Sequence, residues 1–574
     1  MSDMAVQPPR PPLFAPWLME PMLRNKAIYL RVALAATMIN LFSVATSLFT
    51  MTVYDRVVPN GAVASLIALA IGIGIVIVFD FVLRMLRGYF VDLAGARIDR
   101  EVGHAMFTKL LNLRLDARKG PAGALAGLLR EFETLRDFFA SATLVAVVDV
   151  PFILLFLLVI GLIGGPVVIV PLLMIPLVVG VGLLTQPALD RLSSRAMGEA
   201  LGKQAVLVET IGGLETVKAT RAGRLLSSRW MTAMDHHADS SLRQRLVATI
   251  GTTAATSAQS IAYVGVVVVG VTMIMRNEMT MGALIACSIL AGRAIAPLSQ
   301  IAQLLSRLTA TRTAYRELNQ LMRMPVEGPP GEAVRRPRLN GTIEFREVSF
   351  AYPESSVKAL DRASFIIPAG ERVALLGRVG SGKSTIARLI LGLYSPTDGA
   401  VLIDGTDVRQ IHPDDLRSSI GAALQESVLL TGSVRDNIQL DRGLDDEELM
   451  RAARLSGTHD FMGGIANGYD LRLSDRGEGL SGGQRQSIAL ARALATKPPM
   501  LVFDEPTSAM DSQTETALLD RLEAEVEGRT LILITHRSSL LRLVQRVIML
   551  DRGRVVADGS RDQIVERLQK PVAA

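Results

Sequence analysis

A glycine-rich segment at residues 377–385 has the spacing needed to hold phosphate groups. It fits the pattern G-x-x-x-x-G-K-[ST], and it follows an apolar run that is typical of a strand. Glycines let backbone N–H groups surround phosphate oxygens, and a helix N-terminus adds positive potential there. We expect nucleotide contacts from Gly377, Gly380, Ser381, Gly382, Lys383, Ser384 and Thr385.

Two carboxylates follow a second apolar run at residues 500–503. A carboxylate at the tip of a buried strand suits a Mg²⁺ contact, and the next one can polarise an attacking water. We therefore assign Asp504 and the Ser384 hydroxyl to Mg²⁺, Glu505 to general-base catalysis, and Lys383 to the β- and γ-phosphates. The sequence thus predicts ATP and Mg²⁺ as cofactors and hydrolysis of ATP as the reaction.

Further segments carry a resemblance to ATP-binding cassette proteins. The signature sequence of that family matches residues 480–484, and the other family elements occur in the expected order, with Met510 where many members have Leu. The resemblance implies that Tyr352 stacks on adenine, that Gln425 contacts Mg²⁺ and water, and that His536 lies near the γ-phosphate. It also implies nucleotide contacts from the D-loop Asp511 and from the signature residues Ser481, Gly482, Gly483 and Gln484.

The N-terminal half contains long stretches without Asp, Glu, Lys or Arg, of the length that spans a bilayer as a helix. Such stretches are residues 32–54, 57–79, 150–189, 246–275 and, around a lone Arg293, 279–306. The third is long enough for two helices, and Gly161, Gly164, Gly165 and Pro166 predict a tight turn near its middle. We therefore predict six membrane-spanning helices.

The loops between these spans predict the topology. Each of the two long loops, residues 85–143 and 185–256, carries nine Lys or Arg, whereas the short turns hold only Arg56 and Arg276. The positive-inside rule then places the long loops and both termini in the cytoplasm. Because these loops account for most of the net charge of +6, the basic balance indicates membrane topology and no nucleic-acid partner.

The expected organisation has four parts. Residues 1–26 form a cytoplasmic tail, 27–321 an all-α six-span transmembrane domain, 322–338 a Pro- and Gly-rich linker, and 339–574 an α/β P-loop nucleotide-binding domain. With one bundle and one nucleotide domain, the chain resembles an exporter half-transporter, which implies a homodimer in which each signature segment caps the partner's ATP. By resemblance, the turns near 114–125 and 212–224 couple the two halves.

The membrane half resembles type I secretion permease/ATPases, in the branch that exports adhesins and repeats-in-toxin proteins. The matching segments are residues 53–60, 147–152, 212–219 and 292–298. Many members carry an N-terminal peptidase-like domain, which this chain lacks. The resemblance implies a bacterial inner-membrane exporter of unfolded protein that works with a periplasmic adaptor and an outer-membrane channel.

Two alternative functions stand beside protein secretion. A lipid, small-molecule or peptide exporter of the same fold stays open, because fold alone does not determine cargo. A soluble cassette ATPase acting on DNA or the ribosome is disfavoured by the six apolar spans. Arg293, inside a span, is a candidate for the substrate path or for a helix pair, while Asp80 and Arg84 are expected to form a local ion pair.

Overall fold

The computed structural model describes residues 15–569 except 118–131, 134, 137, 139–142, 329–334, 337, 354 and 466; for 143–147, 298–310, 475 and 568–569 it describes only the backbone. The chain forms two compact units. One comprises Met1–Leu111 and Lys119–Met324, and the other comprises Asn112–Arg118 and Pro325–Ala574. Each unit is described separately below.

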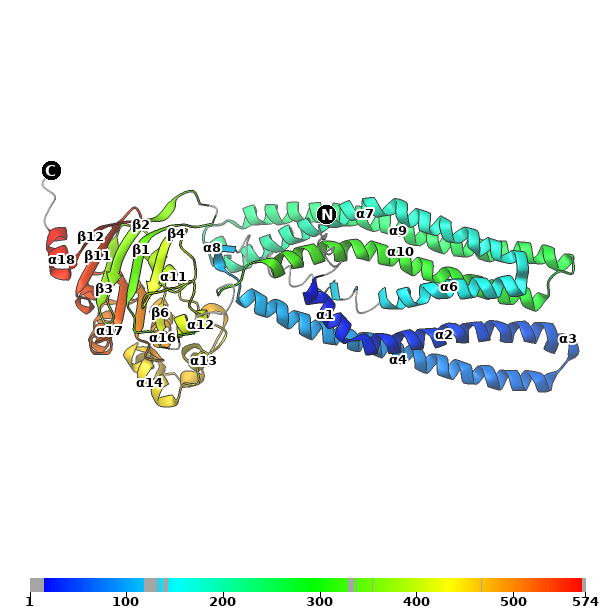
Figure 1. Cartoon of the computed structure of the whole chain (residues 1–574), viewed down its shortest axis with the longest axis horizontal. Coiled ribbons are helices and arrows are strands. Elements are labelled where there is room, and N and C mark those ends of the chain that lie inside the picture. Colours follow the sequence, from blue (N-terminus) through cyan, green and yellow to red (C-terminus); the bar gives the residue numbers. More distant parts are fainter. Residues whose placement is uncertain are drawn as a thin grey trace, which may run out of the picture. The chain divides into compact units, whose positions relative to one another are not determined.

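Long helices make up the first unit (Figure 1). Its helices are α1 (Pro16–Arg24), α2 (Lys26–Thr52), η1 (Val53–Val57), α3 (Val58–Asn60), α4 (Val63–Leu111), α6 (Thr143–Gly164), η4 (Gly165–Val168), α7 (Ile169–Gly212), α8 (Leu214–Ala219), α9 (Gly223–Met275) and α10 (Met281–Arg323). Helix α2 packs against α4, α6 and α10, and α10 also packs against α7 and α9. The fold is therefore a bundle of six long helices.

Apolar composition identifies these helices as membrane spans. Within the described residues, four helical stretches are long and apolar enough to cross a bilayer: Lys26–Asn60, Val63–Leu111, Val148–Gly212 and Gly223–Met275. The third passes twice, because it folds back at η4 between α6 and α7. Gly165 has a left-handed φ of 52° there, so the predicted Gly- and Pro-rich turn is confirmed. Helix α10 begins with a shorter apolar stretch, Met281–Pro297.

Part of the expected N-terminal tail is helical. Helix α1 begins at Pro16, whose fixed φ suits the first turn of a helix. Its Trp17 donates a 3.2 Å hydrogen bond from Nε1 to the Asn319 side chain and stacks on Tyr315, both in α10. The sequence pattern predicts no helix here, because the partners of Trp17 in α10 lie about 300 residues away along the chain.

The second unit is an α/β domain with two main sheets. A four-stranded antiparallel sheet has the order β2-β1-β4-β5, and a six-stranded sheet has the order β12-β11-β3-β10-β9-β6, in which only the β11–β12 pair is antiparallel. The strands are β1 (Ile343–Ala351), β2 (Lys358–Ile367), β3 (Arg372–Gly377), β4 (Asp398–Ile403), β5 (Thr406–Asp407), β6 (Ile420–Ala423), β7 (Gly432–Ser433), β8 (Arg472–Leu473), β9 (Met500–Asp504), β10 (Thr530–Ile534), β11 (Arg546–Asp551) and β12 (Arg554–Ser560).

The described part of the second unit also contains helices (Figure 1). They are η2 (Leu115–Ala117), α11 (Lys383–Ile390), α12 (Pro413–Ser418), α13 (Val434–Gln439), α14 (Asp446–Leu455), α15 (Thr458–Met462), η5 (Gly468–Asp470), η6 (Asp475–Gly477), α16 (Gly482–Leu494), α17 (Ser512–Glu525), η7 (Ser538–Leu543) and α18 (Arg561–Gln569). Of these, α11, α12, α16 and α18 contact the six-stranded sheet, and others, such as α14, pack on helices. Strands β9 and β10 are buried at every position, as expected for parallel strands covered on both faces. The predicted combination of an all-α membrane domain and an α/β nucleotide-binding domain is thus confirmed.

Candidate nucleotide-binding site

The sequence-predicted chemical residues meet at one edge of the six-stranded sheet. Strands β3, β10, β9 and β6 are consecutive neighbours and run parallel, so their carboxyl ends lie together. The glycine-rich loop follows β3, His536 follows β10, Asp504 ends β9 and Gln425 follows β6. Four segments far apart in the sequence therefore contribute to one site.

The glycine-rich loop has the conformation that only glycine adopts readily. The φ angles of Gly377, Gly380 and Gly382 are 153°, 80° and 100°. A Cβ at Gly377 would lie 2.2 Å from the Leu550 carbonyl oxygen, and one at Gly382 would lie 2.4 Å from that of Ala359. The loop is thus held closely against its neighbours, with its backbone free to face a ligand.

Lys383 and Ser381 are buried polar residues of this loop. The Lys383 side chain is buried, and its Nζ donates to the Gly377 and Arg378 carbonyl oxygens at 2.8 and 2.9 Å. Burial lowers the pKa of Lys383. The hydroxyl of Ser381 is buried without a hydrogen-bond partner among the described residues. A buried polar atom without a partner is unfavourable unless a ligand satisfies it.

Two acidic residues follow one another at the tip of β9. Asp504 is 4% exposed, so its carboxylate is buried at the strand tip. Burial raises the pKa of Asp504 and that of Glu505. The Oε1 atom of Glu505 is buried and lies 3.6 Å from Nε2 of His536, which is too long for a hydrogen bond. A water or phosphate oxygen between the two side chains would satisfy both.

The backbone of Glu505 adopts a rare conformation. Its φ is 52°, and its N–H donates to the Ile534 carbonyl oxygen at 2.9 Å, which fixes the residue to the end of β10. A left-handed φ in a non-glycine residue is typical of sites where function outweighs local strain. Gln425 is exposed, two residues after the end of β6, and no hydrogen bond joins it to the other described site residues.

An aromatic cluster surrounds Tyr352. Its ring lies edge-on to Phe350 and Tyr394, with centroids 5.0 and 5.3 Å away. Its hydroxyl is 3.1 Å from Oγ1 of Thr385 and accepts a 2.8 Å hydrogen bond from Arg388. The ring predicted to stack on adenine therefore lies beside the helix that follows the phosphate loop. Arg388, whose guanidinium lies 5.7 Å from the ring centroid, was missed by the sequence analysis.

The signature segment, residues 480–484, forms the start of helix α16. The Ser481 hydroxyl accepts a hydrogen bond from the Gln484 backbone N–H, and the Gln484 side-chain oxygen accepts a 2.8 Å hydrogen bond from the Ser481 backbone N–H, so the two side chains form a capping box. A Cβ at Gly482 would lie 3.0 Å from the Ala509 side chain, and one at Gly483 would lie 3.0 Å from its carbonyl oxygen. The paired glycines thus permit close packing against residues 508–510.

Asp511 also caps a helix. Its carboxylate accepts hydrogen bonds from the Gln513 and Thr514 backbone and from the Thr514 hydroxyl, and the backbone and hydroxyl bonds of Thr514 are the main reason why its pKa is lowered. Among the described residues, no hydrogen bond or ion pair joins residues 480–484 or Asp511 to the glycine-rich loop of the same chain.

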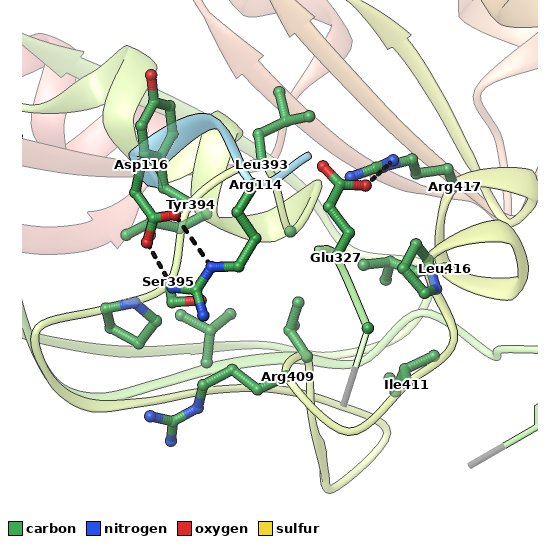
Figure 2. Close-up of a pocket in the computed structure, with 17 residues that line it drawn as sticks. Arg114, Asp116, Glu327, Leu393, Tyr394, Ser395, Arg409, Ile411, Leu416 and Arg417 are labelled. Atoms are coloured by element: carbon green, nitrogen blue, oxygen red, sulfur yellow. Dashed lines mark hydrogen bonds and ion pairs between the residues drawn. The ribbon is translucent and has the colours of Figure 1, made fainter. Parts of the chain in front are cut away.

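A separate cavity of about 390 Å³ lies in this unit, beside the segment at Asn112–Arg118 (Figure 2). Leu113 pairs with Val326, and Glu327 forms a 2.7 Å ion pair with Arg417. The charges that line the cavity are paired: Arg114 bonds to Asp116, and Arg409 bonds to Asp407. The cavity reaches the aromatic cluster through Tyr394 and lies outside the phosphate-binding loop.

Asp80, Arg84 and Arg293 are charged residues within or beside the apolar stretches of the membrane unit. Asp80 and Arg84 form the predicted ion pair at 2.7 Å. Arg293 is exposed on α10 and has no ion pair with a described residue. Asp55 binds the start of α10: it accepts hydrogen bonds from the Thr280 hydroxyl at 2.6 Å and from the Gly282 backbone at 2.8 Å. The predicted coupling turn at residues 114–125 lies outside the described residues from 118 onward.

Comparison with known proteins covers both halves. The ABC transporter transmembrane region matches residues 30–298, and the ABC transporter ATP-binding region matches residues 360–508. A bacterial Atm1-family ABC exporter solved with ATP bound superposes with a TM-score of 0.82, with 25% identity over 96% of both chains.

Curated relatives are toxin translocators. The exotoxin translocation ATP-binding protein PaxB of Pasteurella aerogenes is 32% identical over 552 residues, which are 96% of this chain and 78% of the relative. The toxin RTX-I translocation ATP-binding protein of Actinobacillus pleuropneumoniae is 31% identical over the same shares of the two chains. The leukotoxin translocation ATP-binding protein LktB of Mannheimia haemolytica is 32% identical.

These matches extend through the membrane spans, the phosphate loop and the strand that ends at Asp504. They agree with the fold and with the convergence of phosphate-binding residues at one sheet edge. The chain is a multi-pass membrane protein with an ATP-hydrolysing domain, and it belongs to the ABC transporter family.

Proposed function

We propose that the protein is the ATP-driven exporter of a type I secretion system and moves an unfolded polypeptide out of the bacterial cytoplasm. The observation that carries this proposal is that 78% of the length of the toxin translocators aligns with this chain, through both its membrane and its nucleotide half. The family itself includes exporters of many cargoes, so the cargo is inferred from these relatives and from the motifs of the membrane half.

ATP fits the site at the sheet edge. Lys383 exchanges its two backbone carbonyl partners for the β- and γ-phosphates, and the Ser381 hydroxyl and the surrounding N–H groups satisfy phosphate oxygens. Tyr352 stacks on the adenine, and its edge-on neighbours Phe350 and Tyr394 support its ring. Lys383 and Ser381 are buried, and the Lys383 amine bonds to backbone oxygens.

The hydrolytic step uses Glu505 and His536. The carboxylate of Glu505 accepts the proton of a water that lies beside its unpartnered Oε1, and His536 binds the γ-phosphate from the end of the neighbouring strand. Gln425 contacts the same water. Ser384 and Asp504 are hard oxygen donors that suit Mg²⁺, which neutralises charge on the phosphates, and Mg²⁺ takes few protein ligands when a nucleotide is bound.

The protein works as a homodimer in this proposal. Among the described residues, no hydrogen bond or ion pair joins residues 480–484 or Asp511 to the phosphate loop of the same chain, which supports their contacting the nucleotide held by a second copy. Both termini are cytoplasmic and the long loops face the cytoplasm, as the Lys and Arg distribution indicates. The inner membrane, a periplasmic adaptor and an outer-membrane channel complete the assembly.

Cargo class is tested with the purified protein in lipid nanodiscs. ATP hydrolysis is measured with an added C-terminal secretion-signal peptide of a repeats-in-toxin protein, with a scrambled peptide of the same composition, and with added phospholipid. A polypeptide exporter is expected to respond to the signal peptide and not to the scrambled one. Stimulation by phospholipid alone would instead identify a lipid exporter.

The domain boundaries are inferred to be residues 27–321 for the membrane part and 339–574 for the ATPase part, joined by residues 322–338. Helix α10 ends at Arg323, and β1 begins at Ile343, which supports a linker in this interval. Limited proteolysis is expected to cut between these elements first. Early cleavage inside residues 343–569 would contradict the boundary.

A further inference from the structure

A buried carboxylate lies next to the site but plays no part in the reaction described above. The side chain of Glu515, in α17, is 7% exposed. Its Oε2 accepts hydrogen bonds from the Thr507 hydroxyl at 2.7 Å and from Arg537, and its Oε1 accepts one from the Ser539 hydroxyl. Burial alone would raise the pKa of Glu515, but these three partners outweigh it and hold the pKa below its usual value.

The partners of Glu515 come from the two loops that carry Glu505 and His536. Thr507 lies two residues after Glu505, and Arg537 directly follows His536. The guanidinium of Arg537 also donates to the Met510 carbonyl oxygen from both of its terminal nitrogens, and to the Ser508 carbonyl oxygen, each at 3.3 Å. Arg537 thus binds the backbone of residues 508–510 while it is fixed by Glu515.

The signature helix holds the same loop from its other side. Gln486, in the first turns of α16, donates to the Ser508 hydroxyl at 2.6 Å and to the Glu505 carbonyl oxygen at 3.3 Å. Its side-chain oxygen accepts from the Ala509 backbone at 3.0 Å. Residues 508–510 therefore lie between an amide from α16 and a guanidinium from the loop after β10. A buried ion pair with such partners fixes geometry more than it adds stability.

We propose that Glu515 and Arg537 are positioning residues for ATP hydrolysis, which together with Gln486 join the signature helix to the loop that carries His536. A movement of α16 shifts residues 508–510 through Gln486, and Arg537 passes that movement to His536. The inference rests on the proposed roles of Glu505 and His536. It adds a connection within one chain, from the helix that begins at the signature segment to the switch histidine.

Glu515→Gln and Arg537→Lys test the connection in full-length protein in nanodiscs. Glutamine keeps the size of Glu515 but removes its charge, and lysine keeps the charge of Arg537 but loses the planar fork. We expect kcat for ATP to fall at least about tenfold because a small misplacement of a catalytic group is costly. KM for ATP, and the binding of a fluorescent ATP analogue, should stay within about twofold because the phosphate loop is not touched.

Asp520→Asn is the matched control. Asp520 also lies in α17 and pairs with Arg542 of η7, the helix that holds Ser539, but it is 64% exposed and does not contact residues 508–510. Its kcat and KM are expected to equal those of the wild type. A loss of kcat by Glu515→Gln or Arg537→Lys that is no larger than that of Asp520→Asn would overturn the inference.

A double-variant cycle separates positioning from general destabilisation. Gln486→Leu and Glu515→Gln lie on opposite sides of residues 508–510 and share no direct contact, so independent effects on kcat would multiply. If the two residues act through one connected loop, the double variant loses no more kcat than the worse single variant. If the kcat losses of the two single variants multiply in the double variant, the proposal is contradicted. If Glu515→Gln fails to fold, the same cycle is run with Arg537→Lys.

One further variant distinguishes failure of this inference from failure of the proposed function. Glu505→Gln removes the general base and leaves Gln486, Arg537 and Glu515 in place. If it hydrolyses ATP at the wild-type rate, the assigned hydrolytic site is wrong. If it does not, while Arg537→Lys and Glu515→Gln behave as the control does, only the positioning network is wrong.

Discussion

At the scale of single residues, Glu505 combines three unfavourable features. Its backbone is left-handed with a φ of 52°, its side chain is 13% exposed, and its Oε1 has no hydrogen-bond partner among the described residues. Each of these costs stability, and a bound water beside Oε1 would satisfy the unpartnered carboxylate oxygen. The arrangement is consistent with a residue placed for reaction.

A pH profile follows from this burial. Burial raises the pKa of Glu505, and a general base acts only as the ionised carboxylate. We therefore expect kcat for ATP, measured at saturating ATP between pH 5 and 9, to fall on the acid side at a pH above the usual carboxylate pKa of about 4.3. His536→Gln, which replaces the imidazole by an amide that does not titrate, should keep this acid limb. A profile that stays flat down to pH 5 in both proteins would contradict the assignment.

The phosphate-binding residues were predictable from sequence, whereas their supports were not. The spacing of Gly377, Gly382 and Lys383 specifies a local conformation with a direct chemical use. Gln486, Glu515 and Arg537 follow no such local rule, because their partners come together only when β9, β10 and α16 pack. The only signal in the sequence is that Arg537 directly follows His536, which is already assigned to the site.

At the scale of elements, the segment at residues 53–60 connects the first span to the last. Its π-helical turn places Asp55 beside the N-terminus of α10, where the carboxylate bonds to Thr280 and Gly282. A Cβ at Gly282 would lie 2.5 Å from the Met51 carbonyl oxygen and 2.6 Å from the Asp55 carboxylate. The close approach of α2 and α10 therefore depends on glycine at this position.

Gly282→Ala is expected to destabilise the bundle by about 1–3 kcal/mol, because backbone and carboxylate must move to admit the methyl group. The midpoint of thermal unfolding, followed by size-exclusion chromatography of the detergent-purified protein, should fall. Gly72→Ala is the control, since Gly72 lies in the interior of α4 with no atom within 4 Å of a built Cβ. Equal midpoints for the two variants would show that the contact does not hold the helices together.

Element boundaries were predictable where glycine, proline or charge interrupts an apolar run. The turn between α6 and α7 falls at the predicted glycines. A 40-residue apolar stretch can form two membrane spans only if a turn interrupts it. Helix α1 was missed because its stability comes from Tyr315 and Asn319, about 300 residues away. Likewise, Leu113 pairs with Val326, although the two residues are far apart in the sequence. No local pattern around either residue predicts this pairing.

At the scale of the whole molecule, one chain provides one phosphate loop and one signature segment, and no hydrogen bond or ion pair among the described residues joins them. The proposed homodimer would have two equivalent sites, since Glu505 and His536 are present in each chain. When wild-type and Glu505→Gln chains are co-expressed with different tags and mixed dimers are isolated, their ATPase rate should be well below half that of the wild type. A rate of half would indicate that the two sites work independently.

ATP hydrolysis by the Glu505→Gln variant tests the central claim most directly. Phosphate release by wild-type and variant protein in nanodiscs, with Mg²⁺ and ATP, is compared while binding of a fluorescent ATP analogue is followed in the same samples. Loss of the base is expected to lower the rate by about 10²–10⁴-fold with binding retained. Hydrolysis at the wild-type rate by Glu505→Gln, or a wild type that hydrolyses no ATP, would contradict the account of the protein as an ATP-driven exporter.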